Sequence, residues 1–295
     1  MFRICKFIIM LFLLTGISSY ALPMKDTDTE KMESRSEESD TTSKNQDLDN
    51  ITLPTITVVG KRTISAASDN TVRSRDFMNY PRRTASDLMR FVPGLYITQH
   101  TGGAKAHQIF LRGFDAEHGQ DIAAFLDGIP INESSHVHGQ GYLDLHFLIP
   151  ESIQKIWIMK GPYDPRYGNY ANAGVIDFIP YKKRSFNYSA DLGGGSKKTA
   201  EMIFQSSQDI YEMNNYLVLE GDRTDGYTNP GELRAGRCFI NHTIPLTNSS
   251  EMRFLYAGYS VRSKAADILP KQYIDSDLIS RFNALDNSNK VNVDR

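Results

Sequence analysis

The sequence contains little cysteine, a single tryptophan and almost no excess of charge of either sign. Its 295 residues include 2 cysteines, Cys5 and Cys238, and its 33 basic residues face 35 acidic ones. Two cysteines cannot supply a disulfide framework or a cysteine-rich zinc site. A formal net charge of −2 lacks the basic excess that is typical of nucleic-acid binders, so no nucleic-acid partner is expected. The 40% of hydrophobic residues nevertheless indicate an ordered chain, and the length favours about two domains.

The sequence motifs of common enzymes are also missing. The chain has no Gly-x-Ser-x-Gly elbow and no His-Glu-x-x-His helix, and its acidic residues form no recognisable catalytic pair. Residues 193–198 have the sequence Gly-Gly-Gly-Ser-Lys-Lys, which lacks the Gly-Lys-Ser/Thr ending of a phosphate-binding loop. We therefore predict no catalytic residue and no enzyme, and we interpret the glycine run as a strand that leads into a turn.

Residues 1–21 have the pattern of a secretory signal peptide. Arg3 and Lys6 precede an apolar run from residue 7 to residue 14, and Ser19 and Ala21 flank a tyrosine as at a cleavage site. The alternative, a transmembrane anchor, needs about 20 apolar residues, and this run is much shorter. We predict that the chain is exported and cleaved after Ala21.

The two segments that follow, 22–52 and 53–62, differ in composition. The first is dominated by Asp, Glu, Ser, Thr, Lys and Asn and is predicted to be a disordered tether. The second is rich in strand-forming residues and can add to the edge of a partner's sheet through backbone hydrogen bonds. The alternative, that it is the first strand of the folded domain, stays open. Its apolar and β-branched run consists of Leu53, Pro54, Thr55, Ile56, Thr57, Val58 and Val59.

Residues 63–183 have the pattern of a small α+β domain. Thr84 and Asp87 have the spacing of a capping box, and the helix that they begin ends at Pro93 and Gly94. Short strand-like runs follow, separated by turns rich in glycine and proline, and they favour a mixed sheet. The expected strands are 96–98, 108–111, 122–126, 155–159 and 175–179.

The turn motifs of this domain follow one another in a characteristic order. Their residues are Pro93, Gly94, Arg112, Gly113, Asp127, Gly128, Lys160, Gly161, Pro162, Gly168 and Gly174. With these motifs behind the signal peptide and the strand at 53–59, the chain resembles a TonB-dependent outer-membrane receptor. The resemblance implies an α+β plug domain, a mixed sheet with short helices, at 63–183. It also implies that residues 53–60 bind a TonB-type energy transducer.

One position departs from the family pattern. Receptors of this kind have acidic residues in the strand before the Lys-Gly-Pro turn, and these acids pair with the motif arginine in a lock between plug and barrel. Here Gln154 and Trp157 stand in that strand. We therefore do not transfer the lock, and we expect Arg112 to pair elsewhere, with Asp115 or Asp127 as candidates.

From residue 184 the sequence alternates between apolar and polar residues. Such alternation is typical of a transmembrane barrel strand, with one face in lipid and the other in a wet lumen. A soluble sandwich is the alternative. Plugged transporters use about 22 strands, and residues 184–295 supply roughly five. We predict the start of an antiparallel transmembrane β-barrel that is incomplete in this chain, which is then a fragment or a degraded gene product. The expected strands begin near residues 186, 199, 214, 233 and 251.

Four histidines lie close together in the sequence of the predicted plug, namely His118, His136, His138 and His146. Imidazole suits transition metals, so these residues are candidates for binding a metal, a metal chelate or haem as a transported ligand. The alternative is a polar loop, because the spacing fits no fixed metal-ligand motif. No resident cofactor is expected.

Together these features predict an outer-membrane receptor of a Gram-negative bacterium. It would take up a scarce ligand, such as an iron-siderophore complex, haem or a metal, with energy from the TonB system. Its partners would be a TonB-type transducer, outer-membrane lipid and a small-molecule or metal ligand. The alternative is a periplasmic plug-like binding or adaptor module that acts without a pore.

Overall fold

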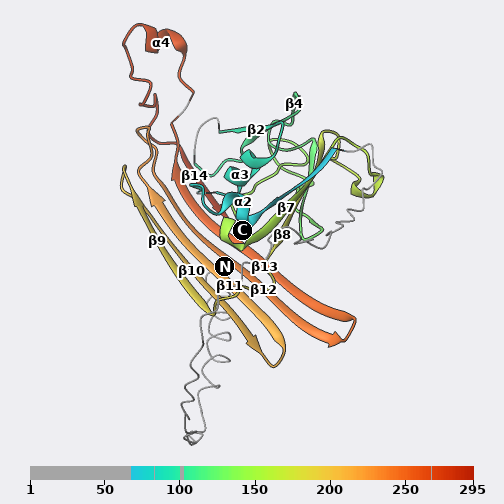
Figure 1. Cartoon of the computed structure of the whole chain (residues 1–295). Helices are drawn as coiled ribbons and strands as arrows, with labels where there is room; N and C mark the ends of the chain where they lie inside the picture. The colour runs from blue at the N-terminus through green and yellow to red at the C-terminus, as the bar shows by residue number, and fades with distance from the viewer. Residues whose placement is uncertain (1–67, 83, 100–102, 267) are drawn as a thin grey trace, which may run out of the picture. The chain divides into compact units, whose positions relative to one another are not determined.

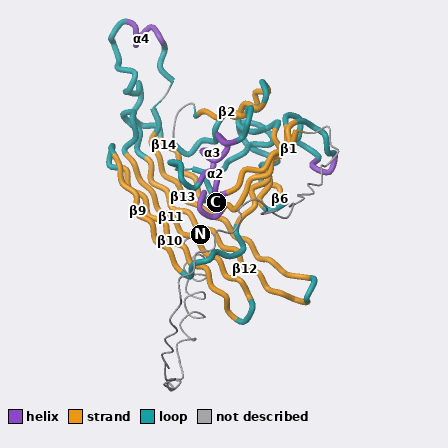
Figure 2. The backbone as a smooth tube through the Cα atoms, in the orientation of Figure 1, coloured by secondary structure: helices purple, strands orange, loops and turns teal. Residues whose placement is uncertain are grey.

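The computed structural model describes residues 68–82, 84–99, 103–266 and 268–295. The predicted signal peptide, the tether and the TonB-box-like strand lie outside the described residues. The described part contains a five-stranded sheet, a three-stranded sheet and a six-stranded sheet (Figures 1 and 2). None of the described helices has the length and apolar character needed to cross a membrane.

The five-stranded sheet is mixed, as the sequence predicts. Its strand order is β1-β7-β8-β5-β6, and β5 runs parallel to β8 while the other neighbours are antiparallel. The apolar faces of β5, β7 and β8 are buried in one core. The strand β1 was not predicted, because its sequence is polar and shows no alternation of apolar residues. Val72 alone in this strand is buried. The bounds are β1 Ser68–Arg73, β5 Ile122–Leu126, β6 Ile129–Pro130, β7 Ile153–Lys160 and β8 Gly174–Pro180.

Short helical turns and a small sheet complete the plug. The Asp87 carboxylate accepts a hydrogen bond from the Thr84 amide at 3.2 Å, so the predicted capping box is present. The helix that it begins continues as a 3-10 turn that ends at Phe91, and Gly94, whose φ of 81° suits glycine, lies in the turn that follows. The remaining elements are α2 Ser74–Phe77, α3 Ala85–Leu88, η1 Met89–Phe91, β2 Leu95–Thr98, β3 Gln108–Leu111, β4 Phe114–Asp115, η2 Pro150–Ser152 and η3 Pro165–Tyr167.

The six-stranded sheet, called the wall below, is antiparallel throughout and follows chain order from β9 to β14. The five predicted strands are present, and the sixth, β14, was missed. β9 and β14 are the two edges, so the sheet does not close. The described part therefore contains an incomplete barrel. The bounds are β9 Tyr188–Gly195, β10 Thr199–Ile210, β11 Met213–Thr224, β12 Leu233–Thr247, β13 Ser250–Lys264 and β14 Lys290–Asp294.

The two faces of the wall differ as a period of two requires. On one face Tyr188, Leu192 and Met202 are exposed, and the register places Leu192 directly opposite Met202. The other face carries Tyr216 and Phe239, which are fully buried in the same core as the plug sheet. The exposed face is thus apolar, and the covered face packs on the plug.

The two ends of the wall also differ. Two-residue turns join β10 to β11 and β12 to β13 at one end. At the other end longer connections, 225–232 and 265–289, follow β11 and β13, and the second contains the short helix α4 (Lys271–Asp275). In Figure 1 this second loop extends beyond the sheet. We call this the long-loop end.

Candidate functional site

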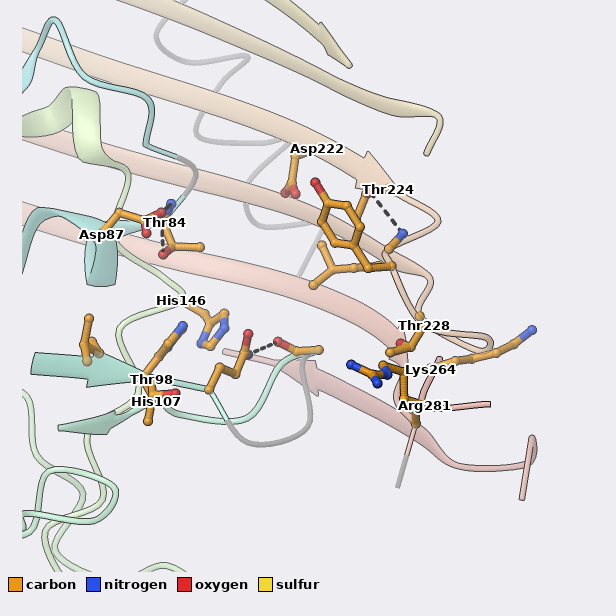
Figure 3. A pocket seen from close by; sticks show the side chains of 18 of the residues that line it. Thr84, Asp87, Thr98, His107, His146, Asp222, Thr224, Thr228, Lys264 and Arg281 are labelled. Carbon is orange, nitrogen blue, oxygen red and sulfur yellow. Dashed lines mark hydrogen bonds between the residues drawn. The ribbon is translucent and has the colours of Figure 1, made fainter. Parts of the chain in front are cut away.

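A cavity of about 770 Å³ lies where the plug, the wall and the long loops meet. This volume lies in the range of small-molecule binding sites, about 300–1,000 Å³. Figure 3 shows plug side chains and wall or loop side chains facing the same space. The plug contributes Thr84, Asp87, Thr98, His107 and His146, and the wall and loops contribute Asp222, Thr224, Thr228, Lys264 and Arg281.

The lining of this cavity mixes apolar and polar residues and carries charged side chains of both signs. Arg90 lies 3.3 Å from the Asp87 carboxylate, and Lys264 lies 3.3 Å from Glu232. Within the described ranges, Arg281 makes no ion pair. Its guanidinium therefore offers several hydrogen-bond donors, beside the threonine hydroxyls, to a bound molecule.

One side of the cavity is formed by a histidine pair, the half-buried His107 and the buried His146. The rings of His107 and His146 stack with their centroids 5.5 Å apart. The Asp144 carboxylate lies 2.9 Å from His146 Nδ1 and also accepts a hydrogen bond from the Tyr259 hydroxyl of the wall. His107 Nδ1 lies 3.2 Å from the hydroxyl of Ser86. The pair thus connects the cavity lining to the contact between plug and wall.

Burial, with a smaller contribution from His146, lowers the pKa of His107 to about 4. Burial alone would raise the pKa of Asp144, but its hydrogen bonds from His146 and Tyr259 outweigh burial, and that pKa is lowered. A neutral His107 beside an ionised Asp144 is therefore the state expected near neutral pH.

Acidification is expected to destabilise the plug through His107. Above pH 6.5 neither the folded nor the unfolded state holds the extra proton, so His107 has no effect on stability. Between pH 6.5 and 4 the unfolded chain binds the proton and the folded chain does not, so stability falls as the pH falls. The loss approaches about 3 kcal/mol near pH 4. A His107→Gln variant should lose this slope when thermal unfolding is followed against pH, and an unchanged slope would contradict the assignment.

The four candidate histidines do not form one cluster. His118, His136 and His138 surround Tyr142, and the His136 and Tyr142 rings stack at 3.8 Å. His146 lies apart from them, against the wall, because the chain after Tyr142 turns onto β12 and β13. The predicted grouping of all four histidines is therefore wrong. The histidine that contacts His146 is His107, and the other three lie around Tyr142.

The rings of His136 and His138 stack with Tyr142, and the ring of His118 is tilted against Tyr142 and His138. His118 Nδ1 lies 3.0 Å from the Ala106 carbonyl oxygen, and His136 Nδ1 accepts a hydrogen bond from the His138 amide at 3.2 Å. Burial, followed by the neighbouring His118 and His136, lowers the pKa of His138. In the part of the chain that the structure describes, no three His, Cys, Asp or Glu side chains are placed to hold a metal ion. The structure gives the metal interpretation no geometric support.

The plug motif residues occupy turns and strand ends. Gly113, Gly128 and Gly161 have φ angles of 84°, 79° and 96°, in the region that favours glycine. Pro162 follows the end of β7, and Gly174 begins β8. These residues shape the plug and none lines the cavity.

Arg112 does not pair with either expected acid. Asp127 forms its ion pair with Arg253 of β13, and Asp115 accepts a hydrogen bond from Gln108 at 2.9 Å. Among the described residues Arg112 makes no ion pair. In β7, Gln154 is exposed and Trp157 packs near Tyr167, with ring centroids 5.7 Å apart. The expected pairing of Arg112 with Asp115 or Asp127 is therefore wrong. Asp127 is paired with Arg253 of the wall, and Asp115 is hydrogen-bonded to Gln108.

Several cavity residues were missed in the sequence. His107 stands directly before the strand β3, and Arg281 belongs to a long polar loop without a motif. Neither residue has sequence neighbours that indicate a binding role, and only the fold brings both to the cavity. The length of the loops was the one feature of the sequence that could have indicated a binding site at this end of the wall.

Comparison with known protein sequences agrees with this architecture. The family model described as the TonB-dependent receptor plug domain matches residues 61–175. Two vitamin B12 transporters named BtuB, from two strains of Vibrio vulnificus, are 26% and 27% identical over 164 and 147 residues. These matches cover 55% and 49% of this chain but 26% and 23% of the relatives. The chain thus spans about a quarter of the length of these relatives.

Solved structures share the fold of the chain. The ferric-catecholate import receptor Fiu of E. coli has a TM-score of 0.53 at 18% identity, over 68% of this chain and 28% of that one. The ferric yersiniabactin uptake receptor FyuA of Yersinia pestis has a TM-score of 0.54 at 19% identity, over 68% and 32%. FpvA of P. aeruginosa, bound to pyoverdines, has a TM-score of 0.56 at 17% identity, over 68% and 26%. Each of these matches includes plug and wall together, since the plug alone is shorter than the covered part.

Proposed function

We propose that this chain is part of a TonB-dependent receptor, represented by its plug domain and the first strands of its barrel, and that it serves uptake of a scarce ligand across the outer membrane. The cavity between plug, wall and long loops is the observation that carries this proposal. A ligand bound there would touch both the wall and the plug. A plug that moves would then release the ligand into the barrel.

The orientation of the wall supports a cavity that opens outward. Transmembrane barrels have short periplasmic turns and longer extracellular loops. The loops 225–232 and 265–289 therefore lie on the extracellular side, and both contribute to the cavity lining. The exposed apolar face, with Tyr188, Leu192 and Met202, would contact lipid.

Energy would reach the plug through residues 53–60. This segment would add as a strand to a TonB-type transducer, which would pull on the chain that leads into β1. Export by the predicted signal peptide would bring the protein to the outer membrane of a Gram-negative bacterium. This proposal rests on the sequence of the segment and on the family of the plug.

The lining favours a ligand with negatively charged oxygen atoms. Arg281, Lys264 and Arg90 line one cavity together with threonine hydroxyls. The relatives are named for vitamin B12, ferric catecholate and ferric yersiniabactin. For this chain we propose an iron-siderophore complex first, with haem or another metal chelate as further candidates. The His118, His136 and His138 group remains a candidate contact for such a ligand.

Arg281→Ala is expected to weaken binding of an anionic ferric siderophore about tenfold, because it removes a charged hydrogen-bond donor that no carboxylate of the described residues engages. Lys271→Ala is the matched control, since it removes one positive charge from the same loop at a residue paired with Asp275. Binding would be measured on whole cells with radiolabelled ferric catecholate, haem and vitamin B12. An equal loss of binding in the Arg281→Ala and Lys271→Ala variants would contradict a direct contact between Arg281 and the ligand.

Cell fractionation separates receptor from adaptor. A receptor should be recovered with the outer membrane, whereas a periplasmic module without a pore should be recovered in the soluble fraction. The exposed apolar face of the wall favours the first result. If none of the three probes binds to cells beyond the level of cells without the protein, the proposed uptake of these ligand classes is wrong.

A further inference from the structure

One buried arginine of the wall holds the plug backbone. Arg237 of β12 lies opposite Glu220 of β11, and its Nη1 donates to the carboxylates of Glu220 and, at 2.9 Å, of Asp222. Its Nε donates to the carbonyl oxygen of His146 in the plug at 2.6 Å. The Arg237 side chain is 2% exposed, and those of Glu220 and Asp222 are 1% and 6% exposed. A single guanidinium thus serves both the wall and the plug.

Other ion pairs near this interface are built differently. Asp127 pairs with Arg253, Glu251 with Lys182, and Glu133 with Arg295, so each pair has one partner on the wall or just beyond its last strand and one on the plug or its connection to the wall. Their side chains are 17–45% exposed. Water can replace the lost partner when such a pair separates, so separation costs little.

At Arg237 both carboxylates belong to the wall. Separating a buried ion pair leaves an uncompensated charge, which costs much more than losing one hydrogen bond. Here the plug supplies a neutral carbonyl group, so its departure leaves the arginine between its two acids. Two carboxyl groups also hold the guanidinium on the wall, whereas one carbonyl group holds it to the plug.

We propose that Arg237 is a positioning residue that latches the plug segment around His146 and that, when this segment leaves, keeps both of its carboxylate partners on the wall. The proposal rests on the proposed function, in which the plug moves relative to the wall. Arg237, Asp222 and His146 all line the ligand cavity, so the latch lies beside the bound ligand.

The latch can be tested by the accessibility of a buried plug residue two positions beyond His146. Leu148 is 1% exposed, and Leu148→Cys would report opening of this segment by its rate of maleimide labelling. The background carries Cys238→Ala, which removes the buried native thiol. Ala124→Cys, in the plug core on β5, is the control for general unfolding. Labelling is measured in outer-membrane preparations without ligand or transducer, so its result is independent of whether transport occurs.

Two variants separate the latch from the charge of the wall. Arg237→Lys keeps a positive charge beside Glu220 and Asp222 but lacks the Nε that donates to His146, and labelling at position 148 should rise about tenfold or more. Arg237→Met with Glu220→Gln and Asp222→Asn removes the same bond and leaves the wall neutral, and it should raise the rate at position 148 by a similar factor. The rate at position 124 should stay unchanged in both. An unchanged rate at 148 in the triple variant overturns the proposal, and so does an equal rise at 124.

Discussion

Replacing Val58 with proline is expected to abolish crosslinking of the 53–60 segment to a TonB-type transducer, and with it energised uptake. Strand addition depends on backbone hydrogen bonds, and proline removes a donor and fixes φ near −65°. A short segment has few such bonds, so the loss of one and the distortion of its neighbours should remove most of the affinity. Ile56→Pro should act in the same way.

Crosslinking from Thr55→Cys to cysteine-substituted transducer measures this effect directly. Ser43→Pro is the matched control, because it places a proline in the tether, where no strand is expected. The Cys238→Ala background removes the thiol of the wall. Crosslinking in the Val58→Pro variant at the yield of the control would show that residues 53–60 do not bind by strand addition.

Expression of residues 22–295 alone is expected to give no heat-modifiable species on a gel. Heat-modifiability reports a closed barrel that resists detergent until it is boiled. In the described wall, β9 and β14 each leave one edge unpaired. Amide and carbonyl groups at such an edge would lack partners in the hydrocarbon core, at a cost of several kcal/mol for each group.

The measurement compares the mobility of heated and unheated samples after detergent extraction, with a closed outer-membrane barrel beside them. A stable species from residues 22–295 that shifts on heating would contradict the strand arithmetic. It would show that the edges find partners, for instance in a second copy of the chain.

The sequence was most informative where a local rule and the final fold agree. Thr84 and Asp87 predict a helix start because a capping box acts within four residues. The alternation that begins near Tyr188 predicts wall strands because one face must be apolar. The turn glycines, such as Gly128, predict their turns because the backbone there needs a positive φ.

Elements whose stability comes from distant partners could not be predicted. The strand β14 is only five residues long and is held by pairing with β13 across the long loop. The candidate site depends on the same kind of contact. His146 was identified by its residue type but assigned to the wrong neighbours, because Tyr259 and Arg237 lie far along the chain. A local sequence pattern cannot predict contacts between residues that lie so far apart in the sequence.

The pairing of β1 with β7 has a consequence for the proposed export. Ser68 lies opposite Lys160, and a chain exported by a signal peptide would emerge with its N-terminus first. β1 would then reach the periplasm long before its partner, and the plug sheet could not be completed until β7 and β8 had been translocated. A hydrophobic strand exposed in that state would pair with other chains. The polar sequence of β1, Ser-Asp-Asn-Thr-Val-Arg, would keep the emerging chain soluble until β7 arrives.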